Sequence, residues 1–429
     1  MDKVKKRNAQ RRTLDPNSGI IRYLGIRRYT RDVRDLGLVL PDPSFVINML
    51  PPGASVDNIA TAVCTRYVHT STNKSKCTIH AARWTPDGRR LLTGAATGEF
   101  TLWNGLTFNF ESIMQAHDGP IRAMRWSHND VWLLSGDDTG TVKYWQSNMN
   151  NLKMVQAHRE PIMDIAFSPN DSRFATASDD STIKIWGFAD SNEERTLTGH
   201  GWDVKCLDWH PTKGLLASGS KDNLVKLWDP KTGAVLSTLH GHHSTVTGIT
   251  WNRNGHWLAT SSRDQMVRVF DVRTLKEMAS FRGSKEISCV AWHPVHEALF
   301  SSGGADGSLM FWDVHAPTAL GGVEKAHDTN IATMDWHPLG HVLATGSNDH
   351  ATRFWGRNRP GEGLVQRIPS RFQGMDDGYF GDGMAAAATA AAAAAPVAAA
   401  RRSAAGAAGA GTGAITVTPS STILPPPGP

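Results

Sequence analysis

The sequence predicts an all-β fold, a seven-bladed β-propeller with a basic, partly helical N-terminal extension and a disordered C-terminal tail. One observation is a closing aromatic residue that recurs every 41 to 43 residues, and a second aromatic series keeps the same step in mid-block. Short apolar stretches separated by Gly and Asp turns, repeated every 40 to 45 residues or so, are typical of four-stranded blades. The closing aromatics are Trp103, Trp145, Trp186, Trp228, Phe270, Trp312 and Trp355, and the mid-block ones are Trp84, Trp126, Phe167, Trp209, Trp251, Trp292 and Trp336.

Residues 1–60 are predicted to form a basic arm followed by a helix. Residues 1–12 are polar and lack apolar periodicity, so we expect them to be disordered when free. Asp15 and Pro16 have the residue types of a helix N-terminus, and the helix is expected to run to about Leu36. Residues 1–34 hold eleven Lys or Arg against three Asp, although the whole chain carries a formal charge of only +5. This uneven charge indicates an acidic partner.

Residues 61–356 are predicted to form the propeller, and residues 199–229 are its most regular copy. Every copy except the last has a fourth apolar stretch after its closing aromatic. The stretch at 62–70 precedes the first full copy. It is therefore expected to supply the outer strand of the last blade and close the ring, which removes free sheet edges.

Each block also repeats a polar set, and this pattern resembles the WD-repeat family. In that family His, Ser or Thr, Asp and Trp form a buried hydrogen-bonded network within a blade. The resemblance implies such a network for His200, Ser218, Asp222 and Trp228 in the fourth block. Three further blocks have equivalent sets, ending at Trp186, Phe270 and Trp355. The blocks ending at Trp103 and Trp145 carry Thr97 and Thr139 where Asp is expected, the sixth block lacks its His, and the first lacks both.

Residues 357–429 are rich in Gly, Ala and Pro, so a disordered tail is predicted. The Ala tract between residues 385 and 400 contains Pro396 and is too weakly hydrophobic for a membrane span, so no membrane partner is expected. The N-terminus is charged and does not resemble a secretory signal. The four cysteines are scattered, which favours a reducing compartment, the nucleus or the cytosol.

The sequence does not predict an enzyme. It contains no HExxH, P-loop, GxSxG or dinucleotide motif. Most of the histidines occupy fixed repeat positions or Trp-His-Pro turns, where hydrogen bonding within the blade explains them. The Ser, His and Asp of one blade are expected to bond an interior Trp, not to line a cleft. We therefore expect no cofactor, no metal and no small-molecule substrate.

The basic arm and the first block together suggest a binding surface. Lys74 and Lys76 add positive charge just before the first block, and Phe108 and Phe110 lie two apart on its predicted outer strand, so their rings should share a face. Cations beside an aromatic ring suit a single-stranded nucleic acid, because phosphates pair with the cations and bases stack on the rings. The alternatives are a solvated or nuclear-import tail, and phenylalanines that pack on a neighbouring blade.

From Thr70 onward the resemblance becomes more specific. The stretches STNKSKC, RWTPDGRRLLTGAATGEFTLWNGLTFNFES, QAHDGPIRAMRWSHND, DVKCLDWHPTKGL and GSNDHATRFWGRNRPGE go beyond generic repeat text. They resemble the WD-repeat subunits of the cleavage and polyadenylation specificity factor, the family of the FY-type proteins of plants. The similarity runs from about Lys3 to Glu362.

This resemblance implies a nuclear, non-catalytic role in pre-mRNA 3′-end formation. The implied partners are polyadenylation-signal RNA of the AAUAAA type, a CCCH zinc-finger subunit and a large multi-propeller scaffold subunit. The RNA contacts of the family fall on a basic cluster, on the loop before the first block, and beside a stacked U–A base pair. In this chain those positions are Lys3, Lys5, Lys6, Arg7 and Arg11; Thr72 and Lys74; and Phe110 and Ile113.

Two departures from the family pattern bear on specificity. Val4 stands where the family has an Arg, and an aromatic that sandwiches the base pair from the other side would precede Met1. Either the chain is truncated at its N-terminus or it grips the hexamer less completely. The rival interpretation is a pure WD-repeat interaction scaffold, such as a ubiquitin-ligase substrate receptor, whose basic arm is only a targeting tail.

Overall fold

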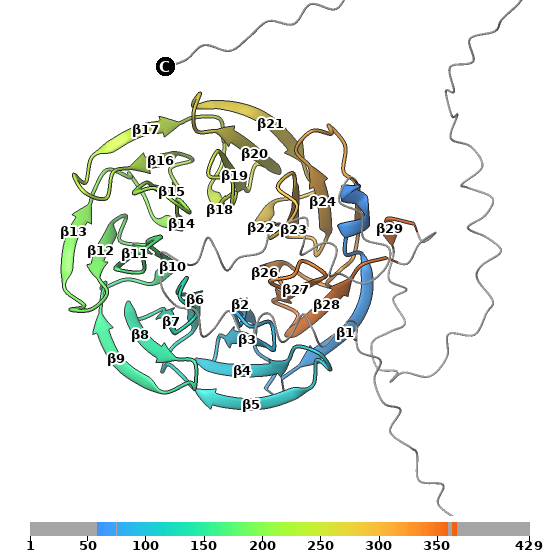
Figure 1. Cartoon of the computed structure of the whole chain (residues 1–429), viewed down its shortest axis with the longest axis horizontal. Coiled ribbons are helices and arrows are strands. Elements are labelled where there is room, and N and C mark those ends of the chain that lie inside the picture. The colour runs from blue at the N-terminus through green and yellow to red at the C-terminus, as the bar shows by residue number, and fades with distance from the viewer. Residues whose placement is uncertain (1–57, 74, 359–362, 367–429) are drawn as a thin grey trace, which may run out of the picture. The chain divides into compact units, whose positions relative to one another are not determined.

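A computed structural model of the chain describes residues 58–73, 75–358 and 363–366. Within these residues the strands form seven sheets arranged as a ring around a central channel (Figure 1). The seven-bladed propeller is therefore confirmed. The basic arm, the predicted helix, Lys74 and residues 367–429 lie outside the described residues.

The blades follow one another in chain order, and each begins with its innermost strand. Blade one contains β2 (Ile79–Trp84), β3 (Arg90–Ala95), β4 (Glu99–Asn104) and β5 (Phe110–Gln115). Blade two contains β6 (Ile121–Trp126), β7 (Trp132–Asp137), β8 (Thr141–Gln146) and β9 (Asn151–Gln156). Blade three contains β10 (Ile162–Phe167), β11 (Arg173–Ser178), β12 (Ile183–Gly187) and β13 (Glu193–Leu197). Blade four contains β14 (Val204–Trp209), β15 (Leu216–Ser220), β16 (Val225–Trp228) and β17 (Val235–Leu239).

The remaining three blades complete the ring. Blade five contains β18 (Val246–Trp251), β19 (Trp257–Ser262), β20 (Met266–Asp271) and β21 (Lys276–Arg282). Blade six contains β22 (Ile287–Trp292), β23 (Leu299–Gly304), β24 (Leu309–Asp313), β25 (Gly321–Val323) and a fifth strand, β29 (Val365–Gln366). Blade seven contains β26 (Ile331–Trp336), β27 (Val342–Ser347), β28 (Ala351–Gly356) and, outermost, β1 (Arg66–Thr72). Residues 365–366, assigned to the tail from the sequence, thus add a strand to blade six.

The ring closes as the sequence predicts. β1 pairs antiparallel with β28, with Tyr67 opposite Trp355 and Thr72 opposite Ala351. The closing strand starts later than expected, because the short 3₁₀ helix η1 (Ile59–Ala62) comes first. The side chain of Asn58 accepts a hydrogen bond from the Ala60 amide and caps this helix.

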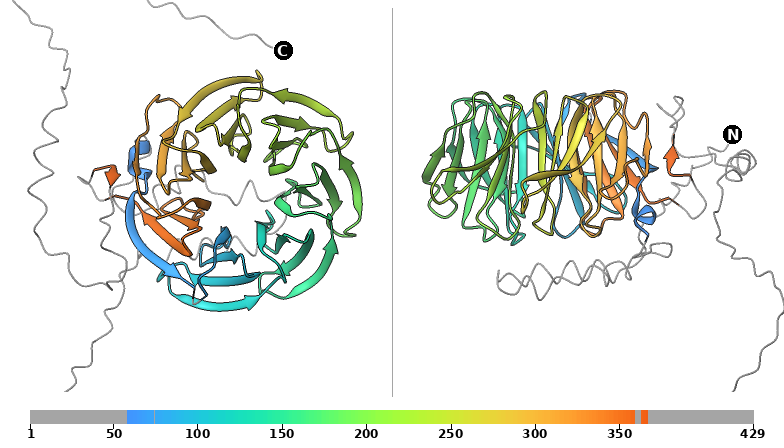
Figure 2. Two further views of the ribbon diagram at one scale, coloured as in Figure 1. Left: turned by 180° about the vertical axis from the view of Figure 1, so that it is seen from behind. Right: turned by 90° about the horizontal axis from the view of Figure 1, so that it is seen from above.

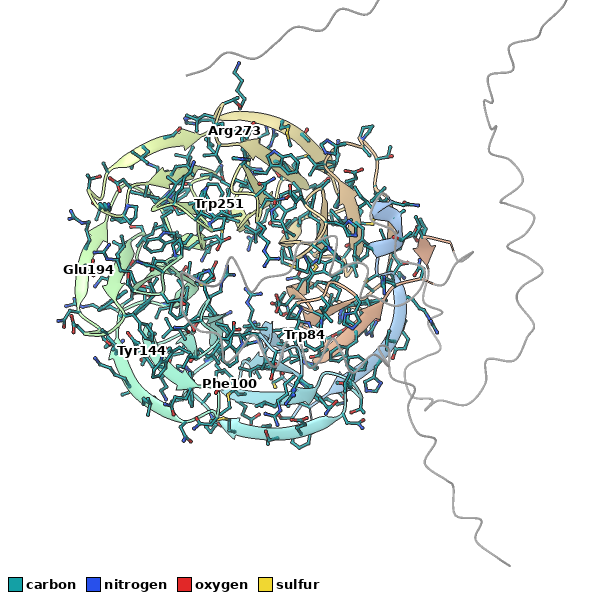
Figure 3. The ribbon with its side chains drawn as sticks, in the orientation of Figure 1. Trp84, Phe100, Tyr144, Glu194, Trp251 and Arg273 are labelled. Carbon is teal, nitrogen blue, oxygen red and sulfur yellow. The ribbon has the colours of Figure 1, made fainter. Side chains whose placement is uncertain are left out.

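The hydrophobic core consists of layers between neighbouring blades. One layer joins Cys206 and Val225 of blade four to Ile249, Trp251 and other residues of blade five. Burying each large side chain in such a layer contributes roughly 1.5 to 3 kcal/mol, so every blade depends on its neighbours. Figure 3 shows this arrangement, with Trp251 nearer the ring axis and Glu194 and Arg273 on the outer rim.

Blade four contains the complete polar network predicted from the sequence. The ring nitrogens of His200 lie 2.9 Å from an Asp222 carboxylate oxygen and 2.7 Å from the Ser218 hydroxyl, and the Trp228 indole N–H donates to the same hydroxyl at 2.7 Å. Burial opposes ionisation of Asp222, but hydrogen bonds from His200 and from two backbone amides outweigh it. They lower the pKa of Asp222 to about 2.

The prediction that blade two lacks its acid was wrong. His117 binds Asp137 at 3.0 Å and the Ser135 hydroxyl at 2.5 Å, so the carboxylate comes from two positions before Thr139. The Thr139 hydroxyl donates to Asp137 at 2.7 Å and holds it in place. In blade six, Ser284 replaces the missing histidine and donates to Asp306 at 2.6 Å. Blades two and six therefore keep a modified form of the hydrogen-bonded network.

Blade one lacks this network, as predicted. The Trp103 indole still donates to the Thr93 hydroxyl at 3.0 Å. The position of the acid is taken by Thr97, whose hydroxyl donates to Glu99 at 3.0 Å. Thr97 and Glu99 are part of the surface, so blade one exchanges a buried network for groups that solvent or a ligand can reach.

The Trp-His-Pro turns connect neighbouring blades. The imidazoles of His210, His293 and His337 bind the backbone carbonyls of Gly255, Gly340 and Gly88 of the next blade at 2.9, 2.9 and 3.1 Å. Gly255 and Gly340 have positive φ, and a Cβ at these positions would lie 2.8 and 2.4 Å from the imidazole. These turns therefore need glycine for both conformation and space.

Candidate nucleic-acid interface

The end of β1 and the residues that follow it lie against the outer part of blade one. The Ser71 hydroxyl donates to the Phe108 carbonyl at 2.7 Å, and the Asn73 amide donates to the Thr101 hydroxyl at 3.0 Å. Ser75 donates to Glu99 at 3.2 Å. Thr72 stays exposed between these contacts. The loop predicted to contact RNA is thus held on both sides of Thr72, although Lys74 itself lies outside the described residues.

Phe110 is the most exposed aromatic residue of this region. It begins β5 opposite Trp103, and 55% of it is accessible to solvent. The buried Trp103 ring meets it edge-on, with the ring centroids 6.1 Å apart. One edge of Phe110 is therefore supported, while much of the ring remains free. Such a ring can stack on a base at little entropic cost.

The expectation that Phe108 and Phe110 share a face was wrong. Phe108 precedes the strand, in a turn with φ of 57°, and is only 4% exposed. Its ring packs 4.2 Å from that of Phe354 in the neighbouring blade. The side chain of Asn104 forms this turn by accepting hydrogen bonds from the backbone amides of residues 106 and 107. β5 begins only at Phe110, and its pairing with β4 shifts between Leu102 and Trp103, so Phe110 and Ile113 lie opposite residues that share one face of β4.

Ile113 belongs to the same surface. It lies opposite Thr101 on the neighbouring strand, it is 46% exposed, and Thr101 accepts the hydrogen bond from Asn73. Phe110 and Ile113 therefore lie on the outer strand of blade one, and Thr72 is the last residue of the neighbouring outer strand, β1 of blade seven. Lys3, Lys5, Lys6, Arg7 and Arg11 lie outside the described residues, so their place relative to this surface stays a prediction.

The negative charge beside Phe110 is compensated. Glu111 accepts hydrogen bonds from Arg90 at 2.5 Å and from Asn104 at 2.9 Å. This pair is part of the exposed surface, so it is screened by salt and adds little to stability. Its effect is electrostatic, because a free carboxylate here would repel a phosphate.

The central channel is an alternative candidate site. It encloses a cavity of about 300 Å³. Arg125 reaches across it to Asp208 at 2.8 Å, and Arg83 lies 3.7 Å from Asp335. Burial, partly offset by a backbone amide and the arginines, raises the pKa of Asp164 to about 6. The two arginines are already paired with carboxylates, so the channel offers poor sites for phosphate.

Residues 58–73, 75–358 and 363–366 contain no group of three or more His, Cys, Asp or Glu side chains that could hold a metal ion. The same stretches hold no helix that is long and apolar enough to cross a membrane.

The resemblance assigns Thr72, Phe110 and Ile113 to the predicted binding surface, but the sequence did not indicate the residues that position them. Ser71 and Asn73 bind blade one from its neighbour, and Trp103 supports the phenylalanine. The available signal was the regular spacing of Trp103. It marks the strand next to β5, so an edge contact with the first residue of β5 could have been inferred.

Comparison with known proteins gives two findings. The family model for the WD domain, G-beta repeat, matches residues 108–146, 149–187, 191–229, 233–271, 275–313 and 320–356. These ranges begin at residue 108, so the repeat formed by β1 to β4 is outside them. That repeat is also the one without His and Asp.

The curated relatives are more specific. The chain is 50% identical to "Polyadenylation factor subunit 2" of Neurospora crassa, covering 84% of this chain and 60% of the relative. It is 52% identical to the protein of that name in Gibberella zeae (76% and 58%) and 44% identical to that of Candida albicans (84% and 74%). The chain spans about three fifths of the length of the first two. A repeat model and relatives named as factor subunits both agree with the prediction that the chain is not an enzyme.

Proposed function

The chain belongs to the Polyadenylation factor subunit 2 family of WD-repeat proteins, and from this we propose that it is a non-catalytic subunit of the nuclear machinery for pre-mRNA 3′-end cleavage and polyadenylation. In that machinery it helps to bind polyadenylation-signal RNA of the AAUAAA type. A CCCH zinc-finger subunit shares the RNA, and a large multi-propeller subunit holds both.

The observation that carries this proposal is the exposed ring of Phe110 on an otherwise well-packed blade. Phe110 is 55% exposed and supported from one side by Trp103. Base stacking on such a ring contributes about 1 to 3 kcal/mol. Ile113, on the same outer strand, provides an apolar contact for the edge of the stacked pair.

The backbone of the RNA needs cations and hydrogen-bond donors. We assign these to Lys3, Lys5, Lys6, Arg7 and Arg11, to Lys74, and to the exposed hydroxyl of Thr72. About four phosphate contacts to a single strand give a slope of roughly −3 for the logarithm of affinity against the logarithm of salt concentration. A slope near zero would contradict the cationic part of the proposal.

The zinc-finger subunit is expected to be needed for tight binding. One stacked base and a few phosphate contacts give only modest affinity. A second subunit bound to the same hexamer, and linked through the common scaffold, raises affinity through effective concentration. The isolated chain should therefore bind weakly and discriminate poorly between related hexamers.

The test uses the chain assembled with the zinc-finger and scaffold subunits. Fluorescence anisotropy compares AAUAAA with AAGAAA RNA for four proteins: wild type, Phe110→Ala, the combined change of Lys3, Lys5, Lys6 and Arg7 to Ala, and Leu152→Ala. Leu152 is the matched control, because it is 57% exposed on the outer strand of blade two.

The expected results differ between the variants. Phe110→Ala should reduce affinity for AAUAAA more than for AAGAAA, and the quadruple change should reduce both and flatten the salt slope. Leu152→Ala should behave as wild type. If affinity and discrimination survive both of the first two changes, the chain is an interaction scaffold and its arm is only a targeting tail.

A further inference from the structure

The outer edge of blade six differs from those of the other blades. Its fourth strand, β25, has only three residues, all buried, whereas the other outer strands have five to seven. A second short strand, β29, pairs with it in parallel, with Gly322 opposite Val365 and Val323 opposite Gln366. β29 and η1 both lie outside the ring beside blades six and seven (Figures 1 and 2).

The contact between β25 and the segment that contains β29 depends on glycine. A Cβ on Gly321 would lie 2.5 Å from the Leu364 carbonyl oxygen and 2.8 Å from its Cβ, and the three nearest atoms all belong to Leu364. The backbone amide of Gly322 donates to the same carbonyl at 3.0 Å. The space over Gly321 is therefore shaped for the approach of another backbone.

Leu364 is the apolar anchor of this contact. Its side chain packs on the cluster that contains Leu320, Val323 and Trp336, between blades six and seven. Val365, the next residue, is 66% exposed and contributes only backbone pairing. One partly buried leucine and a short ladder hold the segment, so the docking is modest and can be disrupted by a single substitution.

The same segment is tied to the closing strand. The Asn358 amide group donates to the Thr65 hydroxyl at 2.7 Å and to the Gly363 carbonyl at 3.1 Å. Thr65 is fully buried and immediately precedes β1. Asn358 thus links the residues leading into β1 with the residues that dock on blade six.

β1 is the outer strand that most needs such a link. In blades one to six a turn or short loop joins the outer strand to the strand beside it, whereas β1 comes from the other end of the chain and no turn joins it to β28, with which it pairs. A strand without a covalent turn can detach at lower free energy than one with a turn.

We propose that blade six carries a strand-binding slot whose occupant is Leu364–Gln366 of the same chain, and that this docking, through Asn358, locks β1 into blade seven. The slot consists of Gly321, Gly322 and Val323, with the apolar cluster against which Leu364 packs. The lock is a property of the ring and does not depend on RNA binding.

The test is hydrogen–deuterium exchange of the full chain carrying Gly321→Ala. The three atoms nearest to the added methyl group all belong to Leu364, so the change should expel the segment and leave the blade intact. Exchange in peptides covering 363–366 and β1 should become about tenfold faster, while β13 and β17 stay at the wild-type rate. Gly214→Ala is the matched control, because the nearest atom to its Cβ is 3.9 Å away.

Three further variants separate the parts of the proposal. Leu364→Asp should reproduce Gly321→Ala from the other side of the contact, and Asn358→Ala should free β1 with a smaller effect on residues 363–366. Gly322→Ala should instead disturb the whole of blade six, because its Cβ would lie 2.5 Å from the Met310 sulfur within the blade.

The exchange rates test both the strand-binding slot and the locking of β1. Unchanged exchange at residues 363–366 in Gly321→Ala means that there is no slot. Faster exchange there with an unchanged β1 means that the docking does not lock the ring. Faster exchange throughout blade six in Gly321→Ala, of the kind expected for Gly322→Ala, also overturns the proposal.

Discussion

Blade four and blade one are both four-stranded sheets, but their polar side chains have different roles. Blade four joins His200, Ser218, Asp222 and Trp228 in one network and matches the repeat pattern fully. Blade one has lost the His and the Asp, receives a segment from blade seven, and exposes Phe110. The regular blade shows how the ring is stabilised, and the irregular one carries the candidate binding surface.

The difference has a physical basis. A buried network requires every partner, because one unpaired polar group costs more than one hydrogen bond contributes. Side chains in such a network are not available to a ligand. In blade one the corresponding positions hold Ser75, Thr97 and Glu99, which are near the surface and bond one another.

Removing the acid of blade four should destabilise the ring strongly. Asp222→Ala leaves His200 without its partner, and we expect a loss of about 2 to 3 kcal/mol in the free energy of unfolding. Glu99→Ala in blade one should cost less than about 1 kcal/mol, because Glu99 lies at the surface. Urea denaturation followed by tryptophan fluorescence measures both, and equal losses would contradict the contrast.

Acid should weaken the seam between blades seven and one before it affects the blade-four network. Burial is the main cause that lowers the pKa of His337 to about 4, below its usual value near 6.5. The unfolded chain therefore binds the proton first, and stability is lost as pH falls from about 6.5 towards 4, by about 2 kcal/mol at pH 5 for this group. Asp222, with a pKa of about 2, stays ionised throughout this range.

The measurement is the urea midpoint at pH 7 and pH 5 for wild type and His337→Asn. The asparagine amide can still donate a hydrogen bond but does not titrate, so the difference between the two pH values should shrink. A pH dependence identical to that of wild type would show that His337 is not responsible.

Phe110 should affect binding without affecting stability. Phe110→Ala is expected to weaken RNA binding by the assembled complex by about 1 to 2 kcal/mol, while the free energy of unfolding changes by less than about 0.5 kcal/mol. Phe110→Trp should restore binding, because the larger ring also stacks. Anisotropy titrations and thermal unfolding of the same preparations test this, and a loss of stability equal to the loss of binding would assign Phe110 to the core.

The smallest effect is expected at the carboxylate beside Phe110. Glu111→Gln removes a negative charge near the predicted phosphate path, so affinity should rise about twofold at low salt and return to the wild-type value at high salt. Arg90→Ala exposes the same charge and should have the opposite effect. Changes of the same sign in the two variants would mean that no phosphate passes nearby.

Much of the fold could be predicted because its signals are large and repeated. The two aromatic series mark the strands of each blade, and the absence of a fourth stretch after Trp355 predicts closure by the first strand. The role of Asp137 as the acid of blade two and the buried position of Phe108 were not predicted, because both depend on turns. A carboxylate two residues earlier can reach the same histidine, and a left-handed residue before β5 reverses the expected alternation.

Only part of the candidate binding surface could be predicted, because some of its contacts join residues that are distant in sequence. Phe110 and Ile113 lie on a strand, and the resemblance identifies them directly. Ser71 and Asn73 act across two blades that are distant in sequence, and no local pattern marks such contacts. β29 was missed because two residues are too few for a recognisable period.

The pairing of β1 with β28 also constrains how the molecule is made. Thr72 and Ala351 are neighbours in the ring, but 279 positions (351 less 72) separate them along the chain. At about 5 to 20 residues per second, a ribosome needs about 15 to 60 s to travel that distance. Throughout this interval the first strand has been synthesised while its partner has not, so its exposed edge is a natural point for a chaperone to act. The last blade becomes complete only when synthesis has passed Gly356.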